Sequence, residues 1–581
     1  MDNNIENKKP SLLERALFKF RLGWLLLFAA VTLVLGYNAV QVRPDASFTK
    51  MIPTQHPFIQ NYFEYQKDLS SLGNVVRIAV ENKQGDIFEP EFQETVKQIT
   101  DEVFYIPGVN RSGLRSLWTP NVRWMEVTEE GFVGGPVIPD GYDGGKESIA
   151  QLRENVLRSG EVGNLVANNF ESTIIYVPLD EVNPETGEKL DYGEFSERLE
   201  TLVRDKYQSD EIGIHITGFA KLIGDLIDGA EQVGLFFLLA ILITLAMLYV
   251  YSRCWRSTFT VLGCSIIAVI WQLGIIDLIG SGINPYSMLV PFLVFAIGVS
   301  HGVQIINAIG YNRTHGFDKF EASKLAFRSL YIAGLTALAS DAIGFTTLMV
   351  IDIAVIKELA IAASIGVAVV VLTNLGLLPI LMSYFGVSDK GVEYHRKAES
   401  EKHIVVRTFE KFAQPKWAYS ALGIAIVLLA WGLYYGQQMQ IGDLDKGSPE
   451  LRPDSRYNLD NAYIVDNYSS STDIFVVMAA TEPQQCIAYN NLEFMDRFSW
   501  HMQNTNGVQD VKSIVYVSKM GMFAINEGNL KWFTLNRNQF VTNASLSRIP
   551  DGLINNDCSM APIIIYLDDH KAETLKNVVA S

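Results

Sequence analysis

The sequence lacks the motifs that mark nucleotide, covalent or metal chemistry. It contains no phosphate-binding loop, no nucleophile elbow and no metal-ligand spacing. Histidines in its polar regions are scattered, and scattered histidines are more often structural or exposed than ligands: His56, His215, His501 and His570. These absences disfavour an ATP-driven primary pump. We predict a protein that is not an enzyme and that needs no cofactor or metal.

Cysteine is scarce, with four residues in a chain of 581. Cys254 and Cys264 lie at or inside apolar runs, where we expect them to pack as small hydrophobic side chains. Cys486 and Cys558 lie in the last polar region, where an oxidising compartment would permit a disulfide. Spacing alone does not establish disulfide geometry, so the sequence leaves this pairing open.

Positive charge is also in deficit. The chain has 47 Lys and Arg against 64 Asp and Glu, a formal net charge of −17. Segment 41–229 alone carries 17 Lys and Arg against 32 Asp and Glu, so most of the excess lies on one polar region. This balance argues against nucleic acid or another anionic polymer as a partner.

Long apolar runs, by contrast, are abundant. A bilayer core of about 30 Å needs roughly 20 mostly apolar residues, and the sequence offers seven such runs. They are 22–40, 233–251, 257–280, 286–309, 330–351, 359–384 and 417–435. The first is longer than the apolar core of a signal peptide, which is about 7 to 15 residues, and no A-x-A site follows it. We therefore predict seven retained transmembrane helices.

The positive charges of the short loops predict the orientation. Lys and Arg follow the second, fourth and sixth spans, whereas the turn at 281–285 has no charge. These loops and the N-terminus are therefore predicted to be cytoplasmic. The predicted domains are a lead-in at 1–21, a span at 22–40, an extracytoplasmic domain at 41–229, five spans within 230–385, a cytoplasmic linker at 386–416, a span at 417–436 and a second extracytoplasmic domain at 437–581.

The two polar domains repeat one pattern about 400 positions apart. "LLERALFKFRLGW" precedes the first span and "HIVVRTFEKFAQPKW" the seventh, and each closes on an interfacial tryptophan. After each span we predict a polar helix, a β-branched strand, a second helix (89–103; 489–502), a turn ("IPGV"; "TNGV") and another strand (114–118; 511–517).

The first domain continues with predicted strands at 172–179 and 212–218 around a helix at 192–207. The second domain reaches a strand at 561–569, the counterpart of 172–179, before the sequence ends at Ser581. We interpret both domains as α+β folds and the second as an incomplete copy.

The chain has one helix, then an α+β domain, then five helices, and this order begins a second time. This layout resembles the resistance-nodulation-division (RND) transporter superfamily. "GVSHGVQ" at 298–304 stands where MmpL-type lipid exporters have a Gly-Val-Asp-Tyr sequence. "LTALASDAIGF" at 335–345 is similar to the fifth span of Patched-like and hopanoid-transporter-like members, and the bundle at 230–385 resembles a sterol-sensing domain.

The resemblance implies an α-helical integral membrane protein with two extracytoplasmic α+β porter domains and seven of twelve expected spans. It further implies a multi-pass protein of the bacterial inner membrane that exports hydrophobic or amphipathic, lipid-like molecules, driven by the proton-motive force. Expected partners are periplasmic or outer-membrane proteins, or further copies of the chain. Two alternatives stay open: a non-transporting lipid sensor or scaffold, and a half-transporter that is inert without a second half.

In the family, carboxylates of the fourth span carry protons, but here Ser300 and His301 stand where relatives have Asp and Tyr. We hypothesise that His301 and Asp341, from the fifth span, form a proton relay instead. An imidazole beside a carboxylate can titrate near the working pH, and its protonation changes the charge and packing of the pair. The competing interpretation is a neutral His301 that only holds the bundle together.

Other intramembrane groups fill supporting roles in this hypothesis. Gly298, Gly302 and Gly344 are interpreted as helix-packing residues. Asp277 lies near a span end and is expected to reach the interface. The supporting polar residues are Ser300, Gln304, Asn307, Ser340 and Asp277.

Overall fold

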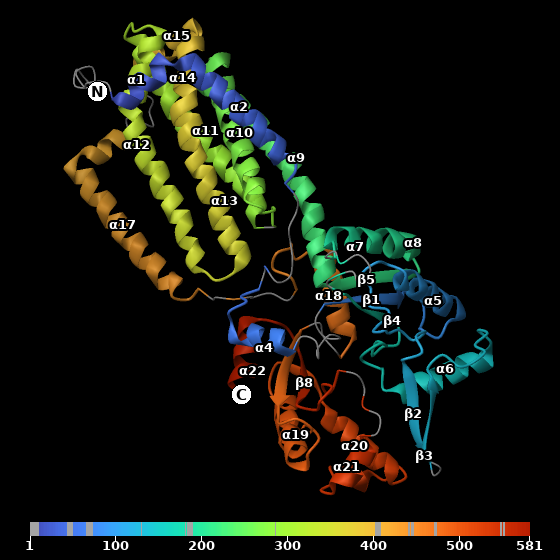
Figure 1. Cartoon of the computed structure of the whole chain (residues 1–581). Helices are drawn as coiled ribbons and strands as arrows, with labels where there is room; N and C mark the ends of the chain where they lie inside the picture. Colours follow the sequence, from blue (N-terminus) through green and yellow to red (C-terminus); the bar gives the residue numbers. More distant parts are fainter. Residues whose placement is uncertain are drawn as a thin grey trace. The chain divides into compact units, whose positions relative to one another are not determined.

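A computed structural model places the chain in two compact units (Figure 1). It describes residues 11–42, 50, 52–65, 74–128, 131–180, 182, 187, 190–284, 286–400, 408–439, 442, 447–469, 473–546, 549 and 552–581. The start of the predicted lead-in and residues 401–407 of the predicted linker lie outside these ranges. The helix unit comprises Met1–Gln60 and Gly229–Met439, and the sheet unit comprises Asn61–Asp228 and Gln440–Ser581.

Seven helices among the described residues are long and apolar enough to cross a membrane. They are α2 (Arg21–Ala39), α9 (Phe219–Ser252), α10 (Trp255–Leu278), η2 with α11 (Ser287–Leu289, Val290–Thr314), α12 with η3 (Lys319–Thr347, Leu348–Val350), α13 with η4 and α14 (Ala354–Val370, Val371–Leu377, Leu378–Phe385), and α17 (Pro415–Gly436). They coincide with the seven predicted spans.

Helix α10 is central to the helix unit, and α2 packs closely against it. Gly274 permits this approach, because a Cβ at that position would clash with the carbonyl oxygen of Leu35. One turn away, the Trp271 ring stacks on Phe28 with ring centroids 5.4 Å apart, and its Nε1–H donates to Thr32 Oγ1 at 2.9 Å. Helix α17, the sequence counterpart of α2, has no buried residue.

The amphipathic lead-in forms α1 (Leu12–Lys19), capped by the Ser11 side chain. Its apolar face places Phe18 against Phe320 and Phe327. Glu14, only 1% exposed, pairs with Arg328 of α12 at 2.6 Å. This short helix is therefore fixed to α12 by both apolar packing and a buried ion pair. At the same end of the helix unit lie α15 (Asp389–Ser400) and, ahead of α17, η5 (Lys411–Ala413).

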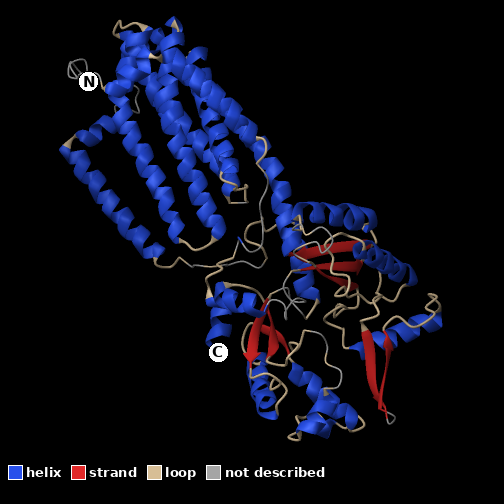
Figure 2. Ribbon diagram, in the orientation of Figure 1, coloured by secondary structure: helices blue, strands red, loops and turns tan. Residues whose placement is uncertain are grey.

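The sheet unit contains two three-stranded antiparallel sheets (Figure 2). The first has the order β4-β1-β5 (Ser172–Pro178, Val75–Asn82, Ile212–Gly218), and the second β6-β8-β7 (Ile474–Ala480, Met560–Leu567, Val508–Lys512). β1 pairs with β4 as β6 pairs with β8, with Ile78 opposite Ile175 and Val477 opposite Ile563. Each first strand follows a helix, α4 (Pro57–Tyr65) or α18 (Arg456–Asn467), and precedes another, α5 (Pro90–Phe104) or α19 (Tyr489–Gln503). The shared pairing matches the repeat seen in the sequence.

The strand predicted at 114–118 is wrong. This segment contributes only one isolated bridge, Arg115 with Tyr176. β7 holds the equivalent place in the second sheet, with Val508 opposite Leu567. The strand predicted at 511–517 ends at Lys512, because α20 (Ile514–Ile525) begins two residues later.

The sequence analysis also missed several elements of the sheet unit. They are the hairpin of β2 (Arg123–Thr128) and β3 (Gly131–Pro136), α6 (Lys146–Ser159), η6 (Leu530–Trp532), α21 (Gln539–Ser545) and α22 (Ala572–Ala580). The helix predicted at 192–207 is present as α7 (Tyr192–Leu199), a π-helical turn η1 (Glu200–Arg204) and α8 (Asp205–Tyr207).

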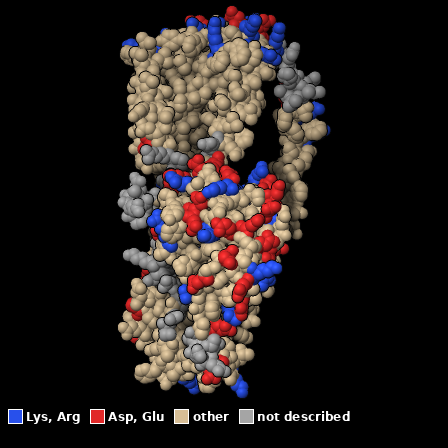
Figure 3. Space-filling view, turned by 90° about the vertical axis from the view of Figure 1, so that its right-hand side faces the viewer, with Lys and Arg blue, Asp and Glu red and all other residues tan. Residues whose placement is uncertain are grey.

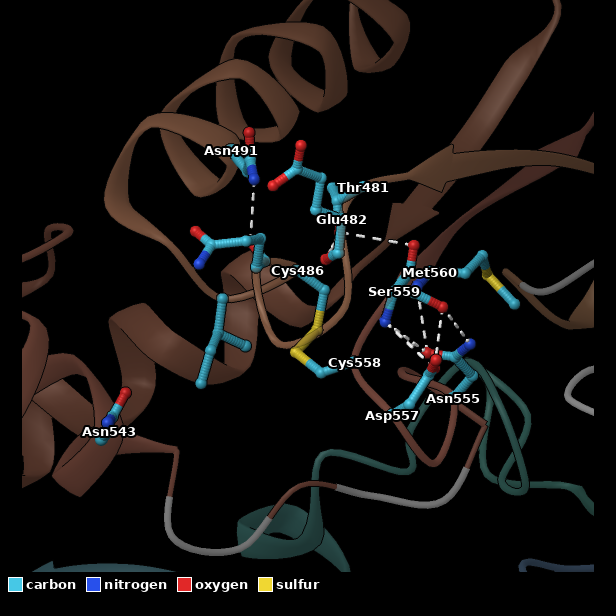
Figure 4. Close-up of a disulfide and its surroundings, with 12 residues drawn as sticks. Thr481, Glu482, Cys486, Asn491, Asn543, Asn555, Asp557, Cys558, Ser559 and Met560 are labelled. Atoms are coloured by element: carbon cyan, nitrogen blue, oxygen red, sulfur yellow. Dashed lines mark hydrogen bonds between the residues drawn. A yellow bond between two sulfur atoms is a disulfide. The ribbon is translucent and has the colours of Figure 1, made fainter.

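A disulfide joins Cys486 and Cys558 in the second half of the sheet unit, with their Cα atoms 5.1 Å apart (Figure 4). The Cys486 N–H also donates to the Cys558 carbonyl oxygen at 3.1 Å. Asn555 fixes the adjacent turn, because its Oδ1 accepts from the N–H groups of Ser559 and Met560. The bridge therefore links the loop before α19 to the turn before β8. Cys254 and Cys264 are free and buried.

Candidate functional site

The two predicted relay residues lie on adjacent helices of the helix unit, His301 on α11 and Asp341 on α12. His301 is half-buried, and its Nδ1 lies 3.1 Å from the carbonyl oxygen of Ile297 in its own helix. Asp341 is exposed. Within the described ranges, no hydrogen bond or ion pair joins the two side chains. The structure therefore places them on neighbouring helices without a hydrogen bond or ion pair between their side chains.

Four of the five supporting polar residues, all except Asp277, are exposed on the outside of the helix unit. The exposed side chains are Ser300, Gln304 and Asn307 on α11 and Thr336, Ser340 and Asp341 on α12. We call these six residues the polar face. Polar and ionisable groups facing hydrocarbon are costly, and in membrane proteins they normally face a protein partner or water. The polar face is therefore expected to meet a protein partner or water rather than lipid tails.

The three glycines predicted to pack helices differ in how closely neighbouring atoms approach them. A Cβ at Gly298 would lie 2.6 Å from Nδ2 of Asn374, and one at Gly302 would lie 2.7 Å from Cγ1 of Val261. Gly298 and Gly302 thus sit at close helix contacts, whereas a Cβ at Gly344 would meet no atom within 4 Å. Asp277 is half-buried next to the last residue of α10.

Two buried amides inside the bundle escaped the sequence analysis as a pair. Gln272 on α10 and Asn374 on η4 are both 0% exposed. Among the described residues, neither side-chain amide has a hydrogen-bond partner. Such an unmet group costs about 1–3 kcal/mol. Asn374 lies in the π-helical stretch of span six, and π-helical turns occur often at functional sites. The sequence feature that could have indicated each of them is a single amide side chain within an apolar run.

The sheet unit contains a pocket of about 330 Å³ lined by residues of both repeats. Its apolar lining includes Val75, Leu222, Pro449 and Ile474, and its polar lining includes Arg77, Glu450, Tyr457, Asp473 and His570. We call this the sheet-unit pocket. His570 Nδ1 lies 3.0 Å from Asp473 Oδ1. Burial raises the pKa of Tyr457 to about 12, so its hydroxyl stays neutral and accepts from the Gly218 N–H at 3.3 Å.

A buried charge network connects the two repeats within the sheet unit. His215 of β5 lies between two carboxylates, with Nδ1 3.0 Å from Asp460 and Nε2 3.1 Å from Glu81. Its ring stacks on Tyr463 of α18 at 3.8 Å. Because a carboxylate only accepts, both hydrogen bonds form together only when each ring nitrogen carries a proton.

Asp460 of α18 is the centre of this network and is 1% exposed. Arg204 reaches its Oδ2 at 2.8 Å, and the Ile216 N–H donates to the same oxygen at 3.1 Å. Burial alone would raise the pKa of Asp460, but these two groups and the bond with His215 hold it below its ordinary value. The network therefore stabilises the contact between β5 and α18.

Within the part of the chain that the structure describes, no three His, Cys, Asp or Glu side chains are grouped to hold a metal ion.

Comparison with known proteins gives a family match over part of the chain. Residues 175–415 match the MMPL family. The match confirms the resemblance drawn from the sequence and includes both α11 and α12. A relative from Methanocaldococcus jannaschii, named "Putative membrane protein", is 21% identical over 372 residues. Those residues cover 62% of this chain and 89% of the relative.

Proposed function

We propose that this chain, a multi-pass membrane protein with an MMPL-family domain at 175–415, is a proton-driven exporter of hydrophobic or amphipathic, lipid-like molecules. The observation that carries the proposal is the polar face with His301 at its edge. Two neighbouring membrane-length helices carry an imidazole that is half-buried and a carboxylate that is exposed. Intramembrane ionisable residues are functional by default, and proton relays are a main use.

The polar face supports a relay that is completed when a second protein surface covers it. A cover would remove water from around His301 and Asp341 and bring a proton donor and acceptor into one low-dielectric site. Gain or loss of a proton would then change the charge of the interface and its packing. Such a bistable contact is what proton coupling requires.

The sheet-unit pocket supports a substrate of mixed polarity. Its volume of about 330 Å³ falls at the lower end of the roughly 300–1,000 Å³ typical of ligand pockets. Apolar side chains on one part of the lining and Arg77, Asp473 and His570 on another suit a molecule with an apolar body and a polar head. This combination favours an amphipathic substrate.

Proton uptake by the full chain in proteoliposomes tests the proposal, with a pH-sensitive dye inside and an imposed pH gradient. We expect His301→Ala and Asp341→Asn each to lower the uptake rate about tenfold or more, since general acid–base groups contribute about 10²–10⁴-fold. Asp352→Asn is the matched control, because Asp352 is an exposed loop residue paired with Lys357. Near-normal uptake in both relay variants would overturn the relay and favour a lipid sensor.

A further inference from the structure

The helix unit contains a second, strongly basic pocket of about 210 Å³. Three cationic side chains line it: Arg256, Arg313 and Lys319. One carboxylate, Asp389, and residues 385–388 complete the lining. We call this the basic pocket. Figure 3 shows charged side chains gathered at one end of the helix unit and few along its length.

Backbone carbonyls hold the three cations in place without neutralising them. The acceptors are the carbonyl oxygens of Phe385 for Arg256 (3.2 Å), Tyr384 for Lys319 (2.6 Å) and Phe317 for Arg313 (2.8 Å). Among the described residues, none of the three cations forms an ion pair, and Nε of Arg313 is buried without a hydrogen-bond partner. The fold therefore leaves positive charge and one buried donor unmet at this pocket.

Helix ends of both polarities meet at the pocket, because α10 and α12 begin there whereas α11 and α14 end there. Arg256 is the second residue of α10 and Lys319 the first residue of α12. Cations in the first turn oppose the helix dipole, whose N-terminal end is itself positive. The three cationic side chains therefore favour an anion, with the positive N-terminal ends of α10 and α12 set against the negative C-terminal ends of α11 and α14.

We propose that the basic pocket binds the phosphate of an anionic phospholipid headgroup. The volume is smaller than the roughly 300 Å³ at which pockets for drug-sized ligands begin, so a headgroup fits better than a nucleotide. Basic pockets between transmembrane helices on the cytoplasmic side bind such headgroups. The pocket lies at the end of the helix unit that the loop charges predict to be cytoplasmic.

Aromatic side chains next to the pocket favour a lipid over free phosphate. Phe385 lines the pocket and is 52% exposed, while Trp255 precedes Arg256 and is 50% exposed. The Trp255 ring stacks on Phe259, which is also exposed, with centroids 5.4 Å apart. Large rings at a helix end suit the boundary between headgroups and acyl chains. They offer an apolar surface for the chains of a lipid whose phosphate occupies the pocket.

Lipid retention by the purified full chain tests this site. Native mass spectrometry would count phosphatidylglycerol and phosphatidylcholine molecules retained over a titration of each lipid. We expect preference for phosphatidylglycerol, and a loss of about fivefold in its affinity for each cation removed, as in Arg256→Gln and Lys319→Gln. Lys324→Gln is the matched control, because Lys324 lies on the same helix, pairs with Glu321 and does not line the pocket.

A gain-of-affinity variant keeps the test independent of folding defects. Asp389→Asn removes the one carboxylate of the lining and should raise phosphatidylglycerol affinity about fivefold. Equal retention by the Arg256→Gln/Lys319→Gln variant and the Lys324→Gln control would overturn the site. Thermal protection by inorganic phosphate but not by phosphatidylglycerol would overturn the lipid as the source of the anion.

Discussion

At the residue scale, Asp460 illustrates how charge can hold two repeats together. Its carboxylate receives Arg204, His215 and a backbone N–H while lying almost fully out of water. Removing one partner of a buried ion pair is costly because the other charge is left uncompensated. The structure therefore assigns the carboxylate a role in the stability of the sheet unit.

We expect Asp460→Asn to destabilise the sheet unit by about 3–5 kcal/mol at neutral pH. Because folding lowers the pKa of Asp460, its contribution is complete above the unfolded value of about 3.9 and is lost as pH falls through the lower folded value. Hydrogen exchange of β5 and α18 in the full chain would measure this loss.

The control for this prediction is Asp454→Asn, because Asp454 is exposed and its pair with Arg452 is solvated. Exchange rates equal to wild type in Asp460→Asn, or a difference that grows as pH falls below about 4, would contradict the assigned role.

The residues of the polar face can also be considered one by one, because the sequence alone identifies them. Polar residues within an apolar run stand out in the sequence, and the structure places them exposed on α11 and α12. The sequence could not predict that, among the described residues, His301 and Asp341 form no hydrogen bond with each other, or that His301 Nδ1 lies beside the carbonyl oxygen of Ile297. The sheet-unit pocket was also out of reach, because Arg77 and His570 are nearly the whole chain apart.

At the element scale, length and apolarity were enough to predict all seven membrane-length helices. The β-branched runs at 172–179 and 212–218 likewise predicted β4 and β5. The strand expected at 114–118 failed because local turns compete for its backbone. Ser116 N–H donates to Thr119 Oγ1, and Thr119 N–H donates to the Ser116 carbonyl. The run at 511–517 was ambiguous, since a short apolar stretch suits a helix as well as a strand.

The buried amides of α10 and η4 give a prediction about these elements. Gln272→Leu and Asn374→Leu each replace an unmet amide by an apolar side chain of similar size. We expect each to raise the thermal stability of the helix unit, by up to about 1–3 kcal/mol, because the desolvation cost of the amide disappears. Thermal unfolding of the purified chain followed by circular dichroism would measure the change.

Gln304→Leu serves as the comparison, because Gln304 is exposed and its substitution should alter stability by less than about 0.5 kcal/mol. A loss of stability in both core variants would show that the two amides are satisfied by groups outside the protein, such as water.

At the scale of the whole molecule, the repeat explains two exposed features of the helix unit. α2 is tightly packed on α10, whereas its counterpart α17 has no buried residue. The polar face is also uncovered. Both features agree with the proposal that a second bundle surface completes the relay. Under this proposal the second surface belongs to the assembled molecule, and the repeated pattern is the sequence feature that indicates it.

We propose above all that a proton gradient drives movement of a lipid-like molecule by this chain. The most direct test is transfer of a fluorescent phospholipid analogue in proteoliposomes that contain the full chain, with and without an imposed pH gradient. The account predicts transfer that requires the gradient, stops on addition of a protonophore and is lost in His301→Ala. Transfer at the same rate without a gradient, or no transfer under any gradient, would contradict it.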